Sequence, residues 1–246
     1  MTLTAILSAL PEEQFGLVEL LKSPQKITHA SRDFWQGELH GQPVVLVLAR
    51  IGKVAAATTA TALIERFGAG RIVFTGVAGG MGAGVHVGDV VVATDFLQHD
   101  IDASPLFPRY EVPLYGKTRF DGDAALGAQL VKAAQAVLTG GQFNAAFPHA
   151  KVHHGLMASG DRFVSGAGES AALLAALAAA GHEVLAVEME GAAVAQVCHD
   201  YNIPFASVRT ISDRADDSAH VDFPVFVEEV ASRYARAIVE KLLMAL

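Results

Sequence analysis

Short apolar runs alternate with longer stretches of helical periodicity along the whole chain. The runs are rich in β-branched residues and nearly continuous in apolarity, which is typical of strands buried on both faces of a sheet. They cover residues 5–10, 44–49, 72–77, 89–93, 155–159, 184–187 and 205–211. The stretches between them carry apolar residues three and four positions apart, which predicts helices. These cover residues 12–22, 53–67, 124–137, 169–180, 191–201 and 223–243.

This alternation predicts an α/β fold with three layers. No Ser-, Gly- or Pro-rich stretch separates two halves, so we expect residues 1–246 to form a single domain. Residues 98–122 have no clear pattern and place prolines among aromatic residues. Such a loop predicts a lid or a contact between subunits.

Composition narrows the possible partners and the compartment. The 246 residues are 52% hydrophobic and 18% charged, as in a globular protein. A net charge of −8 without a basic run argues against nucleic acid. The longest apolar run, residues 171–180, is about half of the ~20 residues that span a membrane, and no signal peptide is recognisable. The single cysteine, Cys198, excludes an intramolecular disulfide and fits the cytoplasm.

Carboxylates follow three of the predicted strands directly. Glu12 and Glu13 follow the strand at 5–10, Glu188 and Glu190 follow the strand at 184–187, and Asp213 follows the strand at 205–211. Ligands of open α/β sheets bind beyond the carboxyl ends of strands. An acid after a strand can also serve only as a helix N-terminal residue, which is our interpretation of Glu12. For Glu190 and Asp213 we favour a functional role, because a buried carboxylate without a partner costs several kcal/mol.

Other motifs carry less information. The glycine-rich stretch 75–82 predicts a turn after a strand, either a plain tight turn or a place where backbone N–H groups approach a ligand. It matches no phosphate-loop or dinucleotide pattern. Phe163, at another strand end, is either a core residue or a platform for a flat base.

The histidine and cysteine motifs do not favour a metal site or a nucleophilic cysteine. His99-Asp100 and His153-His154 bring no third ligand at a recognisable spacing, so we expect no metal and no cofactor. Cys198-His199 lies in a predicted helix, where sequence neighbours do not face one another.

Six stretches together resemble the 5′-methylthioadenosine/S-adenosylhomocysteine nucleosidases of the nucleoside phosphorylase superfamily. They are Ala-Leu-Pro-Glu-Glu at 9–13, Ile-Gly-Lys-Val-Ala-Ala at 51–56, Thr-Gly-Val-Ala-Gly-Gly at 75–80, Ser-Gly-Asp-Arg-Phe at 159–163, Val-Glu-Met-Glu at 187–190 and Arg-Thr-Ile-Ser-Asp at 209–213. The resemblance implies the fold of that superfamily, a mixed central β-sheet flanked by helices.

The resemblance also implies roles for individual residues. Asp213 would protonate N7 of adenine, and Glu13 would hold and activate the attacking water. Glu190 would grip the ribose hydroxyls, with Met189 packed on the sugar and Arg209 nearby. The remaining implied substrate contacts are the stacking ring of Phe163, the backbone of Val164, Ala78, Gly79, Ser212, the 5′-alkylthio pocket residues Ile51 and Phe223, and Leu106 and Phe107 from the neighbouring subunit of a homodimer.

The chemistry of such a reaction needs two carboxyl groups with different proton affinities. One protonates the leaving purine and the other takes a proton from water, in parallel with glycoside hydrolysis. The turn at Pro11-Glu12-Glu13 favours water over phosphate, because a carboxylate about 4 Å from a phosphate charge costs on the order of 4 kcal/mol. A purine nucleoside phosphorylase is an alternative function, because Arg50 follows a strand and could reach the pocket to hold phosphate. Two further alternatives are a nucleosidase for another 5′-modified nucleoside, of the futalosine or 5′-deoxyadenosine type, and a non-catalytic nucleoside-binding module.

Overall fold

The computed structural model describes residues 1–14, 16–140, 147–216, 226, 230 and 232–246. The strands are β1 (Thr4–Ser8), β2 (Lys22–His29), β3 (Arg32–Leu39), β4 (Gln42–Leu48), β5 (Arg71–Gly80), β6 (Val90–Gln98), β7 (Phe120–Asp121), β8 (Val152–Ser159), β9 (Val184–Glu188) and β10 (Phe205–Asp213). The helices are α1 (Pro11–Gln14), the 3-10 turn η1 (Val18–Leu20), α2 (Lys53–Glu65), α3 (Ala124–Thr139), α4 (Ala167–Ala179), α5 (Gly191–Tyr201) and α7 (Ser232–Ala245).

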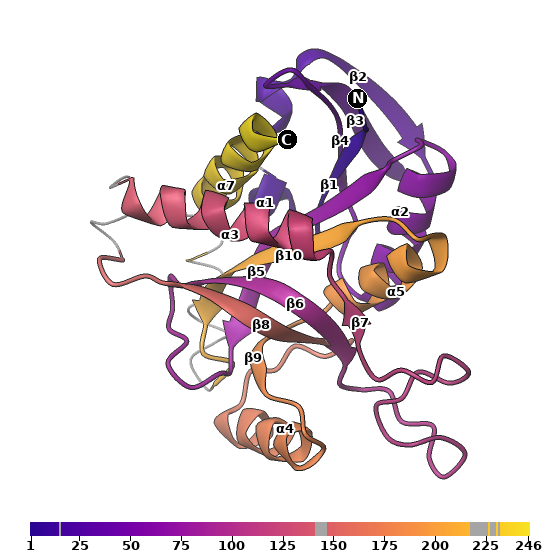
Figure 1. Cartoon of the computed structure of the whole chain (residues 1–246), viewed down its shortest axis with the longest axis vertical. Helices are drawn as coiled ribbons and strands as arrows, with labels where there is room; N and C mark the ends of the chain where they lie inside the picture. The colour runs from indigo at the N-terminus through magenta and orange to yellow at the C-terminus, as the bar shows by residue number, and fades with distance from the viewer. Residues whose placement is uncertain (15, 141–146, 217–225, 227–229, 231) are drawn as a thin grey trace.

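The strands form one mixed sheet, as predicted (Figure 1). β1 pairs in parallel with β4 and β5, and β3 and β2 extend the sheet beyond β4 in antiparallel fashion. On the other side, β5 pairs with both β10 and β9. Because β10 also pairs with β6, β6 with β8 and β8 with β9, these five strands close into a ring. The ring brings the carboxyl ends of β5 and β10 close to that of β9.

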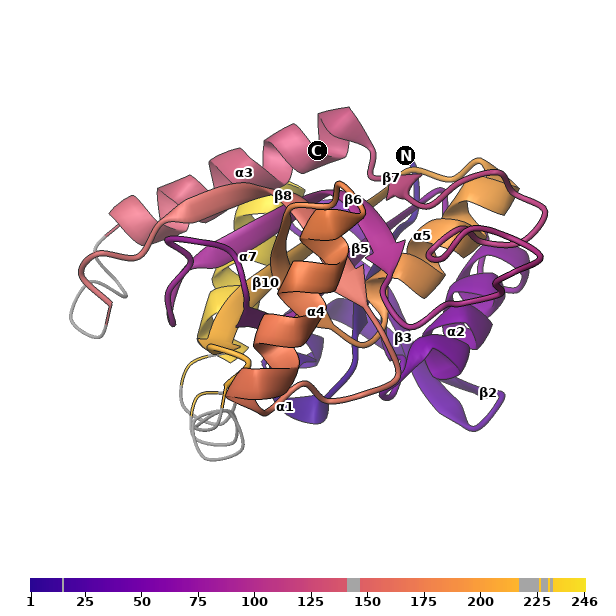
Figure 2. The ribbon, with the colours of Figure 1, turned by 90° about the horizontal axis from the view of Figure 1, so that it is seen from below.

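Helices cover both faces of the sheet, which confirms the predicted three layers. One core lies under α2 and α5 and takes Ala5 and Leu7 from β1. The other lies under α3 and α7 and takes Ile6, the residue between them. Figure 2 shows α3 on one side of the sheet and α2 and α5 on the other. In the described part of the chain, no helix combines the length and apolarity needed to cross a membrane.

The prediction of a helix over residues 12–22 is wrong for most of its length. α1 ends at Gln14, and Gly16 has a left-handed φ of +79°, which an α-helix cannot continue through. The chain then makes η1 and enters β2. The hairpin of β2 and β3 is absent from the prediction, because β2 is a polar, exposed edge strand without apolar alternation. Its turn residues, Ala30 and Ser31, both have positive φ but lack the usual Asn-Gly signal.

The predicted glycine-rich turn is also wrong, because β5 continues as a strand to Gly80. Gly79 pairs with Asp213 of β10 on one side and with Val187 of β9 on the other. Pairing on both sides keeps this segment extended despite its glycines. Of the helix predicted over 223–243, α7 covers Ser232–Ala245, and residues 223–225 lie outside the described residues.

The loop over residues 98–122 projects away from the sheet at the lower right of Figure 1. It exposes 84% of Leu106 and 90% of Leu114, whereas Tyr110 is buried. Large exposed apolar side chains support a role in covering another surface. A lid or a subunit contact stays the prediction for this loop.

Candidate active site

Glu13 is held beneath the end of β1 by the turn that carries it. Its side chain is buried, and Oε2 accepts hydrogen bonds from the backbone N–H groups of Ala9 at 2.7 Å and Leu10 at 2.9 Å. Oε1 accepts a third from the N–H of Val77 at 3.0 Å. The carboxylate therefore links the end of β1 to the glycine-rich part of β5.

Arg209 lies beside Glu13, in the middle of β10. A Cβ atom at Gly76 would collide with Nη1 of Arg209 and lie 2.6 Å from Oε1 of Glu13, so both side chains occupy the space that this glycine leaves. Nη2 of Arg209 lies 2.5 Å from Glu188 and 3.6 Å from Glu190. The guanidinium of Arg209 therefore interacts electrostatically with the carboxylates of Glu13, Glu188 and Glu190. It also lies 4.0 Å from the centre of the Phe74 ring.

Glu188 is the residue that sequence reasoning left out of the site. Besides Arg209, its carboxylate accepts hydrogen bonds from the Ser159 hydroxyl, from the N–H of Glu190 at 3.1 Å and from that of Gly191 at 2.8 Å. It therefore fixes the start of α5 against the end of β8. The position of Glu188, two residues before Glu190 in an otherwise apolar stretch, could have indicated that it belongs to the site.

Glu190 completes the charged group at the N-terminus of α5. It is 4% exposed, and its Oε1 accepts a hydrogen bond from the N–H of Gly52 at 2.9 Å. Burial, with a contribution from the charge of Glu188, raises the pKa of Glu190 to about 8, although Arg209 opposes the shift. Burial also raises the pKa of Glu13, against Arg209 and the three backbone N–H groups. Near neutral pH the free cluster therefore retains a proton.

Asp213, at the last position of β10, lines the same cavity as Glu188. It is buried, with Oδ1 accepting from the N–H of Ala215 at 2.8 Å and Oδ2 from the hydroxyl of Ser212 at 2.7 Å. Ser212 also lies 3.4 Å from the carbonyl oxygen of Ala78. A Cβ at Gly79 would lie 3.0 Å from Oδ1 of Asp213, so a glycine there keeps the carboxyl group approachable.

A small cavity of about 30 Å³ opens in front of Asp213. Phe163, exposed by 43%, stands at its mouth, which suits a ring that stacks on a flat ligand. The cavity is lined by Gly79, Arg162, Phe163, Val164, Val187, Glu188, Met189 and Asp213. The structure thus brings four of the predicted substrate residues together with the predicted acid Asp213, and adds Arg162, Val187 and Glu188.

Five predicted residues described above do not line this cavity, namely Glu13, Ala78, Glu190, Arg209 and Ser212, and four further predicted positions lie away from it or outside the described residues. Ile51, 53% exposed, directly precedes Gly52, whose N–H donates to Glu190. Leu106 and Phe107 belong to the projecting loop and do not line the cavity within one chain. Phe223 lies outside the described residues. The roles of all four stay predictions.

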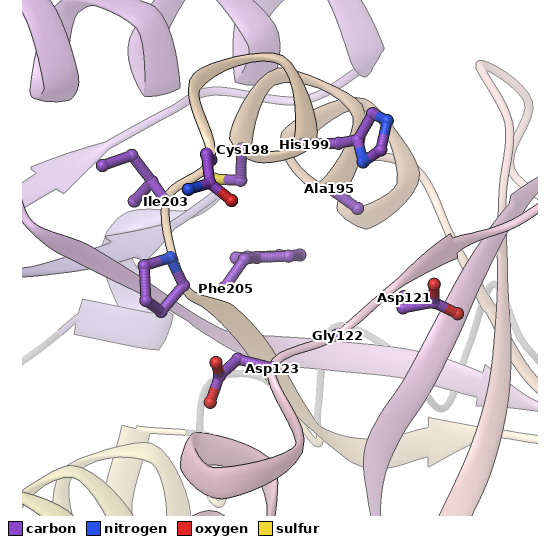
Figure 3. A pocket seen from close by; sticks show the side chains of 10 residues that line it. Asp121, Gly122, Asp123, Ala195, Cys198, His199, Ile203 and Phe205 are labelled. Atoms are coloured by element: carbon purple, nitrogen blue, oxygen red, sulfur yellow. The ribbon is translucent and has the colours of Figure 1, made fainter. Parts of the chain in front are cut away.

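A second hollow of about 340 Å³ lies at the opposite end of β10, beside Phe205 (Figure 3). Cys198 and His199 of α5 face it from one side, and Asp121 and Asp123 from the other. Asp123 is the N-cap of α3, and burial raises the pKa of Cys198 to about 12, which makes its thiol a poor nucleophile. Among the described residues, none of the predicted site residues lines this hollow.

The two histidine motifs do not form a metal site in the described residues, where no group of three or more possible ligands occurs. His153 instead pairs with the buried Asp89, 2.7 Å away.

Comparison with known proteins identifies the class of protein to which this fold and its buried carboxylates belong. The model of the phosphorylase superfamily matches residues 4–244. A 5′-methylthioadenosine/S-adenosylhomocysteine nucleosidase of Bacillus thuringiensis is 35% identical over 97% of each chain. The nucleosidase of the same name from Neisseria meningitidis, solved with methylthio-immucillin-A, superposes over 100% of each chain with a TM-score of 0.89 and 34% identity. A futalosine hydrolase mutant of Helicobacter pylori also covers 100% of each chain, with a TM-score of 0.87 and 29% identity.

The chain therefore belongs to the phosphorylase superfamily and, within it, to the family of 5′-methylthioadenosine/S-adenosylhomocysteine nucleosidases.

Proposed function

We propose that this protein hydrolyses the N-glycosidic bond of 5′-methylthioadenosine and S-adenosylhomocysteine, releasing adenine and a 5′-thioribose product. The names of its relatives and the cavity in front of Asp213 both support this activity. The reaction would serve methionine salvage. It needs no cofactor, because a proton donor, a water and a carboxylate are sufficient for bond cleavage.

Asp213 acts as the acid. The bond between C1′ of ribose and N9 of adenine breaks as N7 takes a proton, because a protonated adenine leaves far better than its anion. The hydroxyl of Ser212 and the N–H of Ala215 fix the orientation of the carboxyl group. Phe163 stacks on the base, and the backbone of Val164 meets the purine edge, at the cavity that both residues line.

Glu13 acts as the base. Water attacks C1′ and gives its proton to the carboxylate of Glu13, which three backbone N–H groups hold in place. Glu190 accepts hydrogen bonds from the ribose hydroxyls. The developing positive charge on the sugar offsets the excess of negative charge around Arg209, so that the transition state gains more from the cluster than the ground state does.

The observation that carries hydrolysis over phosphorolysis is the bonding of Glu13. A phosphorylase needs backbone N–H groups or basic side chains to hold phosphate. Here the N–H groups at the end of β1 and at Val77 already bind the carboxylate of Glu13. Arg50, the basic residue that kept the phosphorylase alternative open, is exposed and bonds to the carbonyl of Ser31 at 2.6 Å.

A second candidate is hydrolysis of a nucleoside with a different 5′ group. The similarity to a futalosine hydrolase supports this alternative, and the 5′ side is the part of the site that includes the exposed Ile51. Kinetics across a panel of 5′-substituted adenosines and futalosine distinguishes the two.

We also propose a cytoplasmic homodimer of a single domain, residues 1–246. The exposed Leu106 supports the dimer, because a side chain exposed by 84% beside Phe107 suits a second subunit whose cavity it would cover. The absence of any second cysteine to pair with Cys198 supports a reducing compartment.

Release of adenine in phosphate-free buffer tests the activity. We expect release without phosphate, with Asp213→Asn and Glu13→Gln each lowering turnover roughly 10²–10⁴-fold, as for loss of a general acid or base. Glu12→Gln, at the exposed neighbour of Glu13, is the matched control. Release that requires phosphate would establish the phosphorylase instead, and near-normal turnover in either variant would refute that residue's role.

A further inference from the structure

Lys53, at the start of α2, joins segments that are far apart in the sequence. Its Nζ lies 2.5 Å from Oδ1 of Asp100 and donates to Oε1 of Gln98 at 3.1 Å. Its side chain is only 16% exposed, whereas lysine side chains are mostly exposed. The ammonium group therefore contacts the end of β6 and the start of the projecting loop.

Asp161, from the loop after β8, closes this contact into a circuit. Oδ1 of Asp161 accepts from the N–H of Lys53 at 2.7 Å, and the N–H of Asp161 donates to Oδ2 of Asp100 at 2.9 Å. Burial alone would raise the pKa of Asp100, but the Lys53 ammonium and the Asp161 N–H hold it below its ordinary value. Asp100 is therefore ionised at neutral pH, and its contact with Lys53 is a charge-assisted hydrogen bond.

The circuit lies between the two walls of the proposed site. Gly52, directly before Lys53, donates its N–H to Glu190 at 2.9 Å, and Ile51 precedes it. Asp161 lies two residues before Phe163, which stands at the mouth of the cavity. A Cβ on Gly52, which has a φ of +98°, would lie 3.1 Å from Oδ1 of Asp161, so the two loops approach closely.

We propose that Lys53, Asp100 and Asp161 form a latch. The latch holds the loop that follows β8 and carries Phe163, the base-stacking loop, against the loop of Ile51 and Gly52 beside Glu190, the sugar-side loop. The inference rests on the proposed function, since it concerns the affinity for the same nucleoside. None of the three residues lines the cavity, so they are positioning residues. Without the latch, a smaller fraction of molecules has both walls in place, and the apparent dissociation constant rises as the inverse of that fraction.

The test compares Lys53→Met and Asp100→Asn with the double variant. The matched control is Lys26→Met, which removes an ion pair of 2.7 Å with Asp33 on the exposed β2–β3 hairpin. For 5′-methylthioadenosine we expect KM to rise about tenfold in each single variant, equivalent to 1.4 kcal/mol. We expect kcat to stay within about twofold of the wild-type value, because bound substrate holds the base-stacking and sugar-side loops together even without the latch. The double variant should match the singles, and the control should match the wild type.

Thermal unfolding and calorimetric binding of adenine accompany the kinetics. Asp100→Asn keeps the shape of the side chain, so it decides the question if Lys53→Met does not fold. An unchanged KM in Asp100→Asn, or a fall in kcat at constant KM, would overturn the latch. A wild-type protein that releases no adenine would refute the proposed function instead, and the adenine affinities of the same variants would then decide whether the latch exists.

Discussion

Replacing Glu190 by glutamine should make the protein more stable at high pH and inactive as an enzyme. The side chain is buried beside Glu188, and its pKa is raised from 4.5 to about 8. Between these two values the folded protein holds a proton that the unfolded chain has released. The contribution of Glu190 to stability is therefore complete below pH 4.5 and is lost as the pH rises through 8.

The magnitude follows from this interval. Linkage between an unfolded pKa of 4.5 and a folded pKa of about 8 removes about 4 kcal/mol of stability from pH 5 to pH 9. Glutamine at this position has the shape of the protonated acid, and its side-chain oxygen can still accept the hydrogen bond from Gly52. The two proteins should therefore be almost equally stable at pH 5, with the variant more stable by several kcal/mol at pH 9.

Urea unfolding of both proteins from pH 5 to 9 measures this difference. Titrating groups outside the cluster, such as the buried His99 whose pKa burial lowers, contribute equally to both proteins and cancel. Glu12→Gln, at an exposed position, should give a curve parallel to that of the wild type. If Glu190→Gln also ran parallel to the wild type, or were the less stable protein at pH 9, the charge imbalance that we infer around Arg209 would be wrong.

Two further predictions concern Gly76 and Glu13. Gly76→Ala should lower turnover at least about 10²-fold, because the new methyl group displaces Arg209 and Glu13, whereas Gly168→Ala, with nothing within 4 Å, should be neutral in the same adenine-release assay. Since the raised pKa of Glu13 must be exceeded before it can accept a proton, kcat/KM should increase with pH through that pKa, and a profile that is flat on its acid side would contradict the assignment.

The sequence was sufficient to predict the layers and most of the sheet. Strands such as β4 and β10 are buried on both faces, so their apolar runs stand out against any helical period. β2 could not be found in this way, because an exposed edge strand needs no apolar residues. The end of β5 was interpreted as a turn because glycine usually marks one, whereas here Gly76 and Gly79 leave room for Arg209 and Asp213.

The site was predictable to the level of its acids and no further. Carboxylates at strand ends pointed to the edge of the sheet that carries the candidate site, but the pairing of Arg209 with Glu188 depends on how β9 and β10 approach each other across the ring. The circuit of Lys53 and Asp161 likewise joins residues 108 positions apart. Contacts between residues so far apart in the sequence depend on how the strands are connected. They produce no repeating pattern of residues from which they could be predicted.

One cation among three buried carboxylates is a poor arrangement for stability alone. A second basic residue beside Glu190 would neutralise the cluster and remove the cost that raises its pKa. It would also remove the attraction for a sugar that becomes cationic as adenine departs. In the mechanism proposed above, the free protein instead keeps a proton on the cluster, and the transition state supplies the missing positive charge only while the bond is breaking. The instability expected above pH 8 and the preference for the transition state thus have the same physical origin, the unbalanced charge around Arg209.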